Sequence, residues 1–122
     1  EGNNQLSNVL DCNPLPPQLP DLIIDSITFT ENITNGTLHA FVNIRTKNIG
    51  NGTSNSSITR AIGLSIIDFS VGSLNPGAVW SSNWVYECTN AHSFNATADY
   101  SGVVTESLEN NNVGITFIDC VL

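Results

Sequence analysis

The sequence predicts an all-β protein that folds as an antiparallel β-sandwich. Apolar and polar residues alternate in six stretches of the chain, which is the period of a strand with one buried face. Clusters rich in Asn, Gly, Pro and Ser separate these stretches, and no window has the apolar stripe of a helix. The expected strands are residues 22–30, 37–47, 58–68, 78–88, 93–99 and 113–120.

The alternation within each expected strand also predicts the core. In residues 37–47 the apolar side chains occupy every second position, so one face of that strand is expected to be buried. The turns between strands carry the sequences ENITNG, NIGNGTSN, LNPG and DYSG. The predicted core side chains are Ile27, Phe29, Leu38, Ala40, Val42, Ile44, Ile62, Leu64, Ile66, Trp80, Trp84, Tyr86, Cys88, Phe94, Ala96 and Ala98.

Length and charge exclude several classes of function. The 122 residues suffice for one domain with a single hydrophobic core. Three Lys and Arg residues face eleven Asp and Glu residues, which argues against nucleic-acid binding and against a basic helix on a membrane surface. No apolar run approaches the roughly 20 residues of a membrane-spanning helix, so we expect no membrane insertion.

Residues that could support catalysis are scattered along the chain. His39 lies on the polar side of an expected strand, and His92 lies in an expected loop. Neither histidine has a recognisable nucleophile–base or metal-ligand spacing, and no glycine-rich phosphate loop precedes a helix. Cys88 shares the core-facing side of its strand. The sequence therefore predicts that the protein is not an enzyme.

Five Asn residues stand in N-x-S/T acceptor sequences for N-glycosylation. Four of them fall in the turns ENITNGT and NIGNGTSNSS, and the fifth is on the outward side of its expected strand. Such positions are accessible to a glycosylating enzyme in an archaeon or a eukaryote, whereas in most bacteria they would stay bare and act as turn formers. The candidates are Asn32, Asn35, Asn51, Asn55 and Asn95.

Carboxylate and amide side chains gather around the DYSG turn. Calcium accepts six to eight such oxygens in loose geometry, so a calcium site is one interpretation. The simpler interpretation is that Asp and Asn fix the turn through local hydrogen bonds. No other cofactor is expected. The candidate calcium ligands are Asp99, Glu106, Glu109 and Asn111, with Asn112 beside them.

The first and last stretches of the chain are similar to each other. EGNNQLSNVLDC at residues 1–12 aligns without a gap with ENNNVGITFIDC at residues 109–120, with five identities. Residues 13–20, NPLPPQLP, contain four prolines and are expected to form a stiff spacer. An array of repeats would explain the match, because residues 1–12 would then end a preceding unit; coincidence is the alternative.

From Pro20 onward the order of features resembles the CARDB family of bacterial and archaeal surface proteins. PDLIIDSITF resembles the first strand of that family, NIRTKNIGNGTS its second strand and turn, and LNPGAVWSSNW a turn that leads into a strand with an aromatic residue. The most specific stretch is ATADYSGVVTESLENNN, which matches the D-x6-E-x2-E-x-N-N ending. The resemblance implies an immunoglobulin-like, seven-strand antiparallel β-sandwich that is extracellular, commonly repeated in tandem, and not catalytic.

The same resemblance divides the chain and implies a function. Residues 1–12 become the terminal strand of a preceding repeat or a donor strand, residues 13–20 a Pro-rich linker, and residues 21–122 the sandwich. We predict a structural repeat or subunit of an extracellular or cell-surface filament, stalk or adhesin, with its N-terminal strand packed in a neighbouring copy. The alternative is a glycan- or protein-binding module. Phe41 interrupts an outward polar pattern, which suits a contact between subunits.

Three cysteines leave one over in a single domain. In an immunoglobulin-like sandwich, the strand that ends at Cys88 and the final strand finish at the same pole. We therefore predict a Cys88–Cys120 disulfide within the domain, which departs from the general family pattern. Cys12 is expected to bond the Cys88 equivalent of a neighbouring unit. The competing pairing is Cys12 with Cys88 of the same chain.

Overall fold

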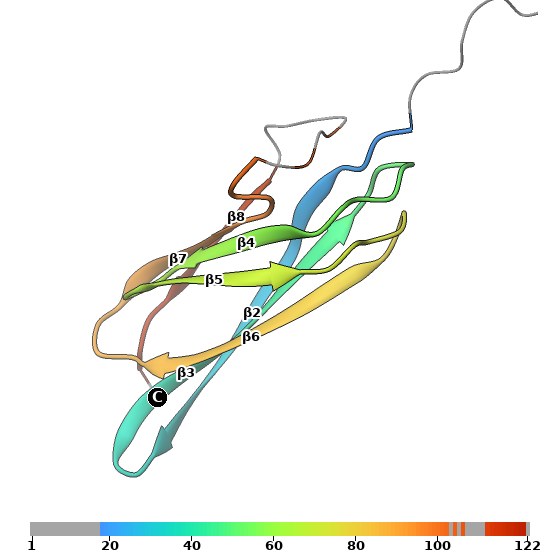
Figure 1. Cartoon of the computed structure of the whole chain (residues 1–122). Coiled ribbons are helices and arrows are strands. Elements are labelled where there is room, and N and C mark those ends of the chain that lie inside the picture. Colours follow the sequence, from blue (N-terminus) through green and yellow to red (C-terminus); the bar gives the residue numbers. More distant parts are fainter. Residues whose placement is uncertain (1–17, 103, 105, 107–111, 122) are drawn as a thin grey trace, which may run out of the picture.

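The structure, a computed structural model, describes residues 18–102, 104, 106 and 112–121. This part of the chain forms strands and no helix (Figure 1). Its two ends lie at opposite poles of the fold (Figure 1). The strands are β2 (Leu22–Thr34), β3 (Thr37–Asn48), β4 (Ser57–Ile62), β5 (Ile66–Val71), β6 (Val79–Glu87), β7 (His92–Thr97) and β8 (Val113–Ile118).

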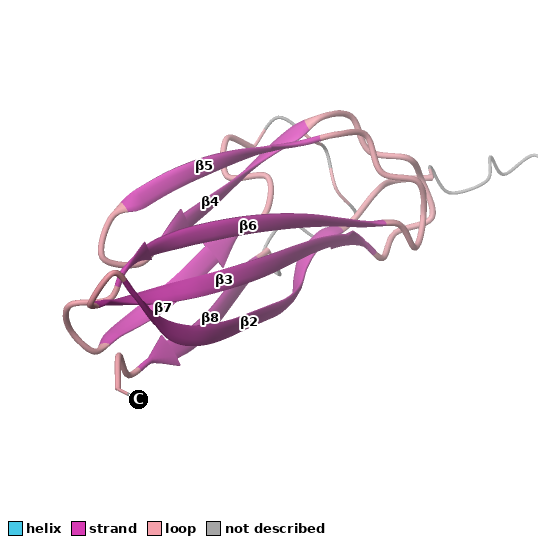
Figure 2. Ribbon diagram, turned by 90° about the horizontal axis from the view of Figure 1, so that it is seen from below, coloured by secondary structure: helices cyan, strands magenta, loops and turns pink. Residues whose placement is uncertain are grey.

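The strands form two sheets that pack face to face (Figure 2). One sheet has the order β2-β3-β6 and the other the order β5-β4-β7-β8, and every pairing is antiparallel. This arrangement confirms the predicted all-β, immunoglobulin-like sandwich. Strands β2 and β8 are edge strands of different sheets that lie beside each other, because Gly114 of β8 leaves room for Ile24 and Ile27 of β2.

The core lies between the two sheets and matches most of the expected alternation. Phe94 is fully buried at its centre, beside Ala40, Val42 and Ile44 of β3. A second buried cluster contains Leu22 and lies near the pole where β2 begins. Between the sheets, the hydroxyl groups of Thr46 and Thr59 are hydrogen-bonded to each other at 2.9 Å, which satisfies two polar atoms that are cut off from water.

The expected single strand at residues 58–68 is wrong, because the chain turns there and forms the β4–β5 hairpin. Ile62 pairs with Ile66 across the turn, and Leu64 lies exposed within it. The buried face of β4 consists instead of Ser57, Thr59 and Ala61. The small side chains of β4 therefore face the other sheet, whereas Ile62 and Ile66 face outward and Leu64 lies in the turn.

Two further expectations from the sequence differ from the structure in detail. The turn expected over ENITNG is shorter, because β2 continues to Thr34 and places Asn32 within a strand. Asn35 and Gly36 alone make the turn, with φ values of 54° and 79°, which is the two-residue type I′ hairpin favoured by Asn-Gly. Trp80 is partly exposed, although its ring packs on Gly72, where a side chain would collide with the indole.

At the pole where the described chain begins, a buried amide joins three segments. The side-chain oxygen of Asn48 accepts hydrogen bonds from the amides of Asp21 (3.0 Å) and Gly50 (2.9 Å). Its side-chain nitrogen donates to the carbonyls of Gly52 (2.8 Å) and Leu74 (2.9 Å). All four hydrogen-bonding positions of this amide are used, so Asn48 fixes the loops that surround the first strand.

The end of the Pro-rich segment packs on the domain. The carbonyl oxygen of Leu19 accepts hydrogen bonds from the amides of Asn51 (3.2 Å) and Gly52 (3.1 Å). The backbone of residues 18–21 runs so close to Gly50 and Gly52 that neither position has room for a Cβ atom. These contacts hold residues 18–21 against the loop at residues 50–52.

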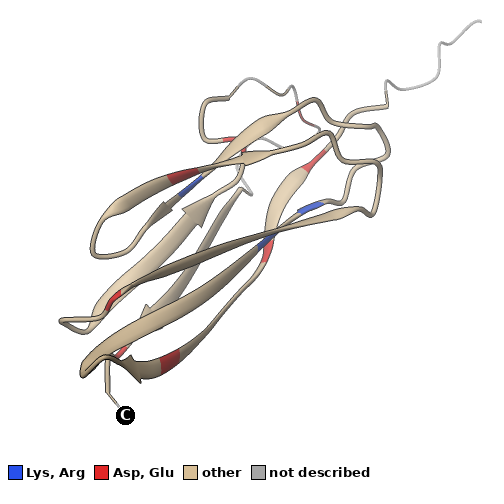
Figure 3. Cartoon of the chain, turned by 60° about the horizontal axis from the view of Figure 1, so that its bottom comes forward, with Lys and Arg blue, Asp and Glu red and all other residues tan. Residues whose placement is uncertain are grey.

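Charged side chains are sparse over the fold (Figure 3). On the outer face of the four-stranded sheet, Arg60 forms a two-pronged ion pair with Asp68, at 2.7 Å and 2.9 Å. This hydrogen bonding holds the pKa of Asp68 below its usual range. The guanidinium group also lies over the ring of Tyr100, 4.0 Å from its centroid.

Candidate functional site at the disulfide pole

A disulfide joins the ends of two strands that belong to different sheets. β6 and β8 run toward the same pole, where Cys88 and Cys120 are bonded with a Cα–Cα distance of 5.5 Å. Cys88 is buried in the core cluster, and Cys120 is half-buried with a positive φ of 55°. The cross-link therefore ties the three-stranded sheet to the last strand of the four-stranded sheet.

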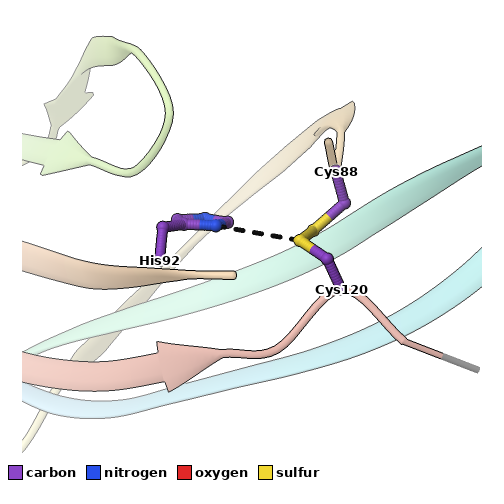
Figure 4. Close-up of side chains that lie close together, drawn as sticks. All are labelled: Cys88, His92 and Cys120. Atoms are coloured by element: carbon purple, nitrogen blue, oxygen red, sulfur yellow. Dashed lines mark hydrogen bonds between the residues drawn. A yellow bond between two sulfur atoms is a disulfide. The ribbon is translucent and has the colours of Figure 1, made fainter. Parts of the chain in front are cut away.

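His92, the first residue of β7, places its ring beside this disulfide (Figure 4). Its Nδ1 atom lies 3.8 Å from the sulfur of Cys120 and 2.7 Å from the carbonyl oxygen of Asn90. Because a carbonyl oxygen can only accept, Nδ1 carries the hydrogen in this arrangement. The other ring nitrogen, Nε2, then accepts the hydroxyl hydrogen of Tyr86 at 2.6 Å. Both ring nitrogens are therefore held in place.

Tyr86 connects His92 to the aromatic core. Its ring centroid lies 4.6 Å from that of Trp84 and 6.4 Å from that of Phe94. Burial, together with the negative charge of Glu31, raises the pKa of Tyr86 to about 12. The hydroxyl group is therefore protonated at ordinary pH and available to hydrogen-bond with the imidazole.

Glu31, near the end of β2, faces the segment that follows β8. Desolvation raises the pKa of its carboxyl group, a hydrogen bond with Asp119 raises it further, and backbone amides of Cys120 and Val121 oppose the shift. A carboxyl group whose pKa is raised on folding favours the folded state most at pH values below its unfolded pKa. This contribution is lost as the pH rises through the folded pKa, so the contact is weakest in the fully ionised state.

The chemistry available at this pole is that of sulfur and imidazole. Sequence reasoning placed the two cysteines together but assigned His92 to a loop with no partner. The spacing of His92 four residues after Cys88 was the signal that it could reach the disulfide, because the chain needs only a short turn between β6 and β7 to bring the two together.

The residues of the predicted calcium site have structural contacts. Asp99 accepts a hydrogen bond from the amide of Val104 at 3.1 Å. Glu106 accepts one from the side-chain amide of Asn112 at 2.7 Å, and that amide also donates to the carbonyl of Leu22. These bonds join Glu106 and Asn112 to Leu22, the first residue of β2. Glu109 and Asn111 lie outside the described residues, and calcium binding stays a prediction.

The glycosylation candidates are on the surface. Four of the acceptor side chains are exposed, and the fifth, Asn95, is half-buried on the outward face of β7, opposite Ile115 of β8. Cys12, the third cysteine, lies outside the described residues. The exposed acceptors are Asn32, Asn35, Asn51 and Asn55.

An apolar stripe on β8 was not expected from the sequence. Val113, Ile115 and Phe117 point outward from this strand and are 56%, 73% and 59% exposed. They face outward because the inward positions of β8 are taken by Gly114, Thr116 and Ile118. β8 is the last strand of its sheet, and among the described strands none pairs with its outer edge.

A second apolar surface lies on the outer face of the three-stranded sheet. Phe41 of β3 and Val85 of β6 are directly opposite each other and are both exposed. They line a shallow hollow together with parts of Phe29 and Trp84. The predicted role of Phe41 as a subunit contact is compatible with this exposure and stays a prediction.

Comparison with known proteins identifies relatives of this fold. A family model described as CARDB matches residues 19–116. A crystal structure of a CARDB domain from Pyrococcus furiosus, in complex with di-metal ions, has a TM-score of 0.64 and 24% identity and covers 85% of this chain and 96% of that chain. A solution structure of a CARDB domain from the same organism has a TM-score of 0.69 and 24% identity, with 84% and 96% covered.

A third solved structure adds a cellular context for the fold. It is a domain from Methanosarcina acetivorans, taken from a protein inferred to lie at the cell surface, with a TM-score of 0.61 and 21% identity over 84% of this chain and 93% of that chain. No curated protein matches this chain. Within the described residues, no helix has the length and apolar character that a membrane span requires.

Proposed function

Because this chain belongs to the CARDB family, we propose that it is a structural module of an extracellular or cell-surface assembly, in which copies pack against one another. The proposal extends the predicted repeat or subunit of a filament, stalk or adhesin. The cell-surface context of the Methanosarcina acetivorans relative supports the location. The Cys88–Cys120 cross-link supports a load-bearing role, because it joins the two sheets at one pole.

The observation that carries this proposal is the apolar stripe of Val113, Ile115 and Phe117 on an edge strand. Edge strands of monomeric proteins are commonly protected by charged side chains, proline or a bulge. β8 carries none of these between Val113 and Ile118. A strand added along this edge would satisfy the backbone groups of β8 and bring apolar side chains beside the stripe.

The occupant that we propose for this edge is residues 1–12 of a neighbouring copy. The sequence match between residues 1–12 and 109–120 indicates that this segment has the pattern of a terminal strand. Val113–Ile118 already forms the last strand of its own sheet, so a donated strand would add beside β8. The Pro-rich spacer after it would then set the distance between copies.

We predict that Ile115→Lys abolishes self-association of the chain. The expected result is a concentration-dependent assembly for the parent protein and a monomer for the variant, measured by sedimentation velocity and light scattering. Ile33→Lys is the matched control, because Ile33 is another exposed isoleucine, 59% against 73% for Ile115, and belongs to β2 of the other sheet. This control should assemble like the parent.

Removal of residues 1–12 identifies the occupant in the same experiment. A shortened chain that stays monomeric, together with monomeric Ile115→Lys, supports strand donation. If the shortened chain still assembles and Ile115→Lys does not, two copies of β8 pair with each other and the donated strand is wrong. Assembly of both altered proteins, or a monomeric parent at every concentration, would contradict packing through this edge.

We also predict that exposed acceptor asparagines carry N-glycans in the native protein, with Asn32, Asn35 and Asn51 as the first candidates. A glycan coat would compensate for the few charged groups and keep strand edges apart. Intact mass before and after enzymatic deglycosylation should differ, and an unchanged mass would show that the acceptors are unused. Glycan mapped to Asn95 would lie on the same face as Ile115 and would argue against packing there.

A further inference from the structure

Two sulfur atoms and one imidazole nitrogen converge at the disulfide pole, and the proposed structural function uses only the sulfurs. The ligand atoms of Cys88, His92 and Cys120 all lie within 4.8 Å of one another. They come from the end of β6, the start of β7 and the segment after β8, and the ring of His92 is directed at the sulfurs (Figure 4). Thiolate sulfur and imidazole nitrogen are the donors that bind zinc most readily.

We propose that reduction of the Cys88–Cys120 disulfide converts this pole into a zinc-binding site, with two thiolates and Nδ1 of His92 as ligands. Reduction adds two electrons and two protons and breaks the S–S bond into two thiols, while a dithiol or phosphine reductant is oxidised. Zinc then replaces the two thiol protons, which leave to solvent. In the oxidised protein the sulfurs carry no negative charge, so the site exists only after reduction.

The geometry of the fold suits this change. In a tetrahedral zinc site, with Zn–S near 2.3 Å and Zn–N near 2.0 Å, a sulfur and a nitrogen ligand are about 3.5 Å apart and two sulfurs about 3.8 Å apart. The sulfur of Cys120 already lies 3.8 Å from Nδ1 of His92. With their Cα atoms 5.5 Å apart, the two cysteines reach the required sulfur separation by side-chain rotation alone.

Tyr86 would position the imidazole for this role. Metal binding at Nδ1 requires the ring hydrogen to be on Nε2, which then donates to the hydroxyl oxygen of Tyr86 at the present distance of 2.6 Å. The hydroxyl group can act as donor or acceptor, so the contact survives the change of tautomer. The carbonyl of Asn90 loses its bond from Nδ1, and because Asn90 is exposed, water can replace that bond.

The fourth zinc position would be open to solvent. Cys120 and His92 are both half-buried, so solvent reaches the site beside them. Zinc sites with three protein ligands and a water molecule are well known, so the set is sufficient for binding. All three ligands are side chains of this chain.

Cobalt(II) is the probe that tests the site, because thiolate coordination gives it a charge-transfer absorption in the near ultraviolet. All measurements use the full chain with Cys12→Ser, so that no third thiol contributes. After reduction with a phosphine, we expect one cobalt ion to bind with thiolate charge-transfer bands, and zinc to displace it. The oxidised protein in the same buffer should show no such bands.

Three variants assign the ligands. His92→Ala should weaken zinc binding by more than about tenfold, measured by competition with a chromophoric chelator. Tyr86→Phe keeps the aromatic packing, should leave the oxidised protein folded, and should weaken binding by about tenfold. His39→Ala is the matched control, because His39 is the other histidine of the chain, and it should bind like the parent.

The proposal is overturned by any of three results. The first is equal binding by oxidised and reduced protein. The second is unchanged affinity in His92→Ala. The third is the absence of cobalt bands in reduced protein that circular dichroism shows to be folded. If the reduced protein is unfolded, failure of zinc to restore the fold counts equally against the site.

Discussion

Replacing Asn48 by alanine is expected to lower the free energy of unfolding by about 3–5 kcal/mol, because four hydrogen bonds, three of them buried, are lost at once. Each unsatisfied buried group costs about 1–3 kcal/mol. The amides of Asp21 and Gly50 and the carbonyl of Gly52 would lose their partner. The carbonyl of Leu74 would keep a bond from the amide of Ser54, which limits the total.

Urea unfolding with the disulfide intact measures this loss. Asn43→Ala is the matched control, because Asn43 has the same side chain on the same strand but makes one exposed hydrogen bond, to Asn83 at 2.9 Å. Its expected effect is within about 0.5 kcal/mol. If the two variants differed by less than about 1 kcal/mol, solvent would be replacing the bonds of Asn48 and the loops would not depend on it.

The outcome at Asn48 also bears on what a single sequence can predict. The alternation in residues 37–47 was sufficient to identify the buried face of β3, because every inward position there is apolar up to Ile44. The alternation did not predict that Asn48 is buried, because Asn48 is polar. Its burial depends on backbone groups from residues 21, 50, 52 and 74, and no local pattern reveals that these groups converge.

The same alternation was misleading in residues 58–68 and incomplete in β8. Ile62, Leu64 and Ile66 have the period of a strand, but a turn between Ile62 and Ile66 breaks it, and tertiary packing selects the small face of β4. In β8 the outward face is the more apolar one, because the inward positions hold Gly114, Thr116 and Ile118. Which face is buried depends on the close approach of β2 to Gly114, a contact between edges of different sheets.

The sequence also predicts one part of the candidate site and not the other. Strand direction was sufficient to predict that Cys88 and Cys120 lie at one pole, because the direction of each strand follows from their order in the fold. The imidazole of His92 was not predicted there, since its position depends on the length of the turn after Cys88. The order of the strands therefore predicts where strand ends lie, whereas the side chains that gather beside them depend on the geometry of the loops.

Removing the Cys88–Cys120 cross-link is expected to destabilise the domain by about 3–4 kcal/mol, from the loop-closure entropy that the disulfide takes away from the unfolded chain. The bond closes a loop with a sequence separation of 32. Double substitution of both cysteines by alanine, in a background with Cys12→Ser, tests this in urea unfolding. The background prevents exchange with the third cysteine.

Mechanical unfolding gives a second and sharper measure of the same bond. When the chain is pulled from its ends, the intact disulfide hides residues 89–119 from the force, so reduction should lengthen the unfolded chain by about 110 Å, at about 3.5 Å per residue over the separation of 32. The alanine double variant should show the long value with or without reductant. An unchanged length on reduction, or a peptide that links Cys12 to Cys88 of the same chain, would contradict this pairing.

The bond ties the end of β6 to the segment after β8. A pull on the C-terminal end is therefore transmitted to the three-stranded sheet before β8 can be separated from its own sheet. An end-to-end assembly under tension requires this property.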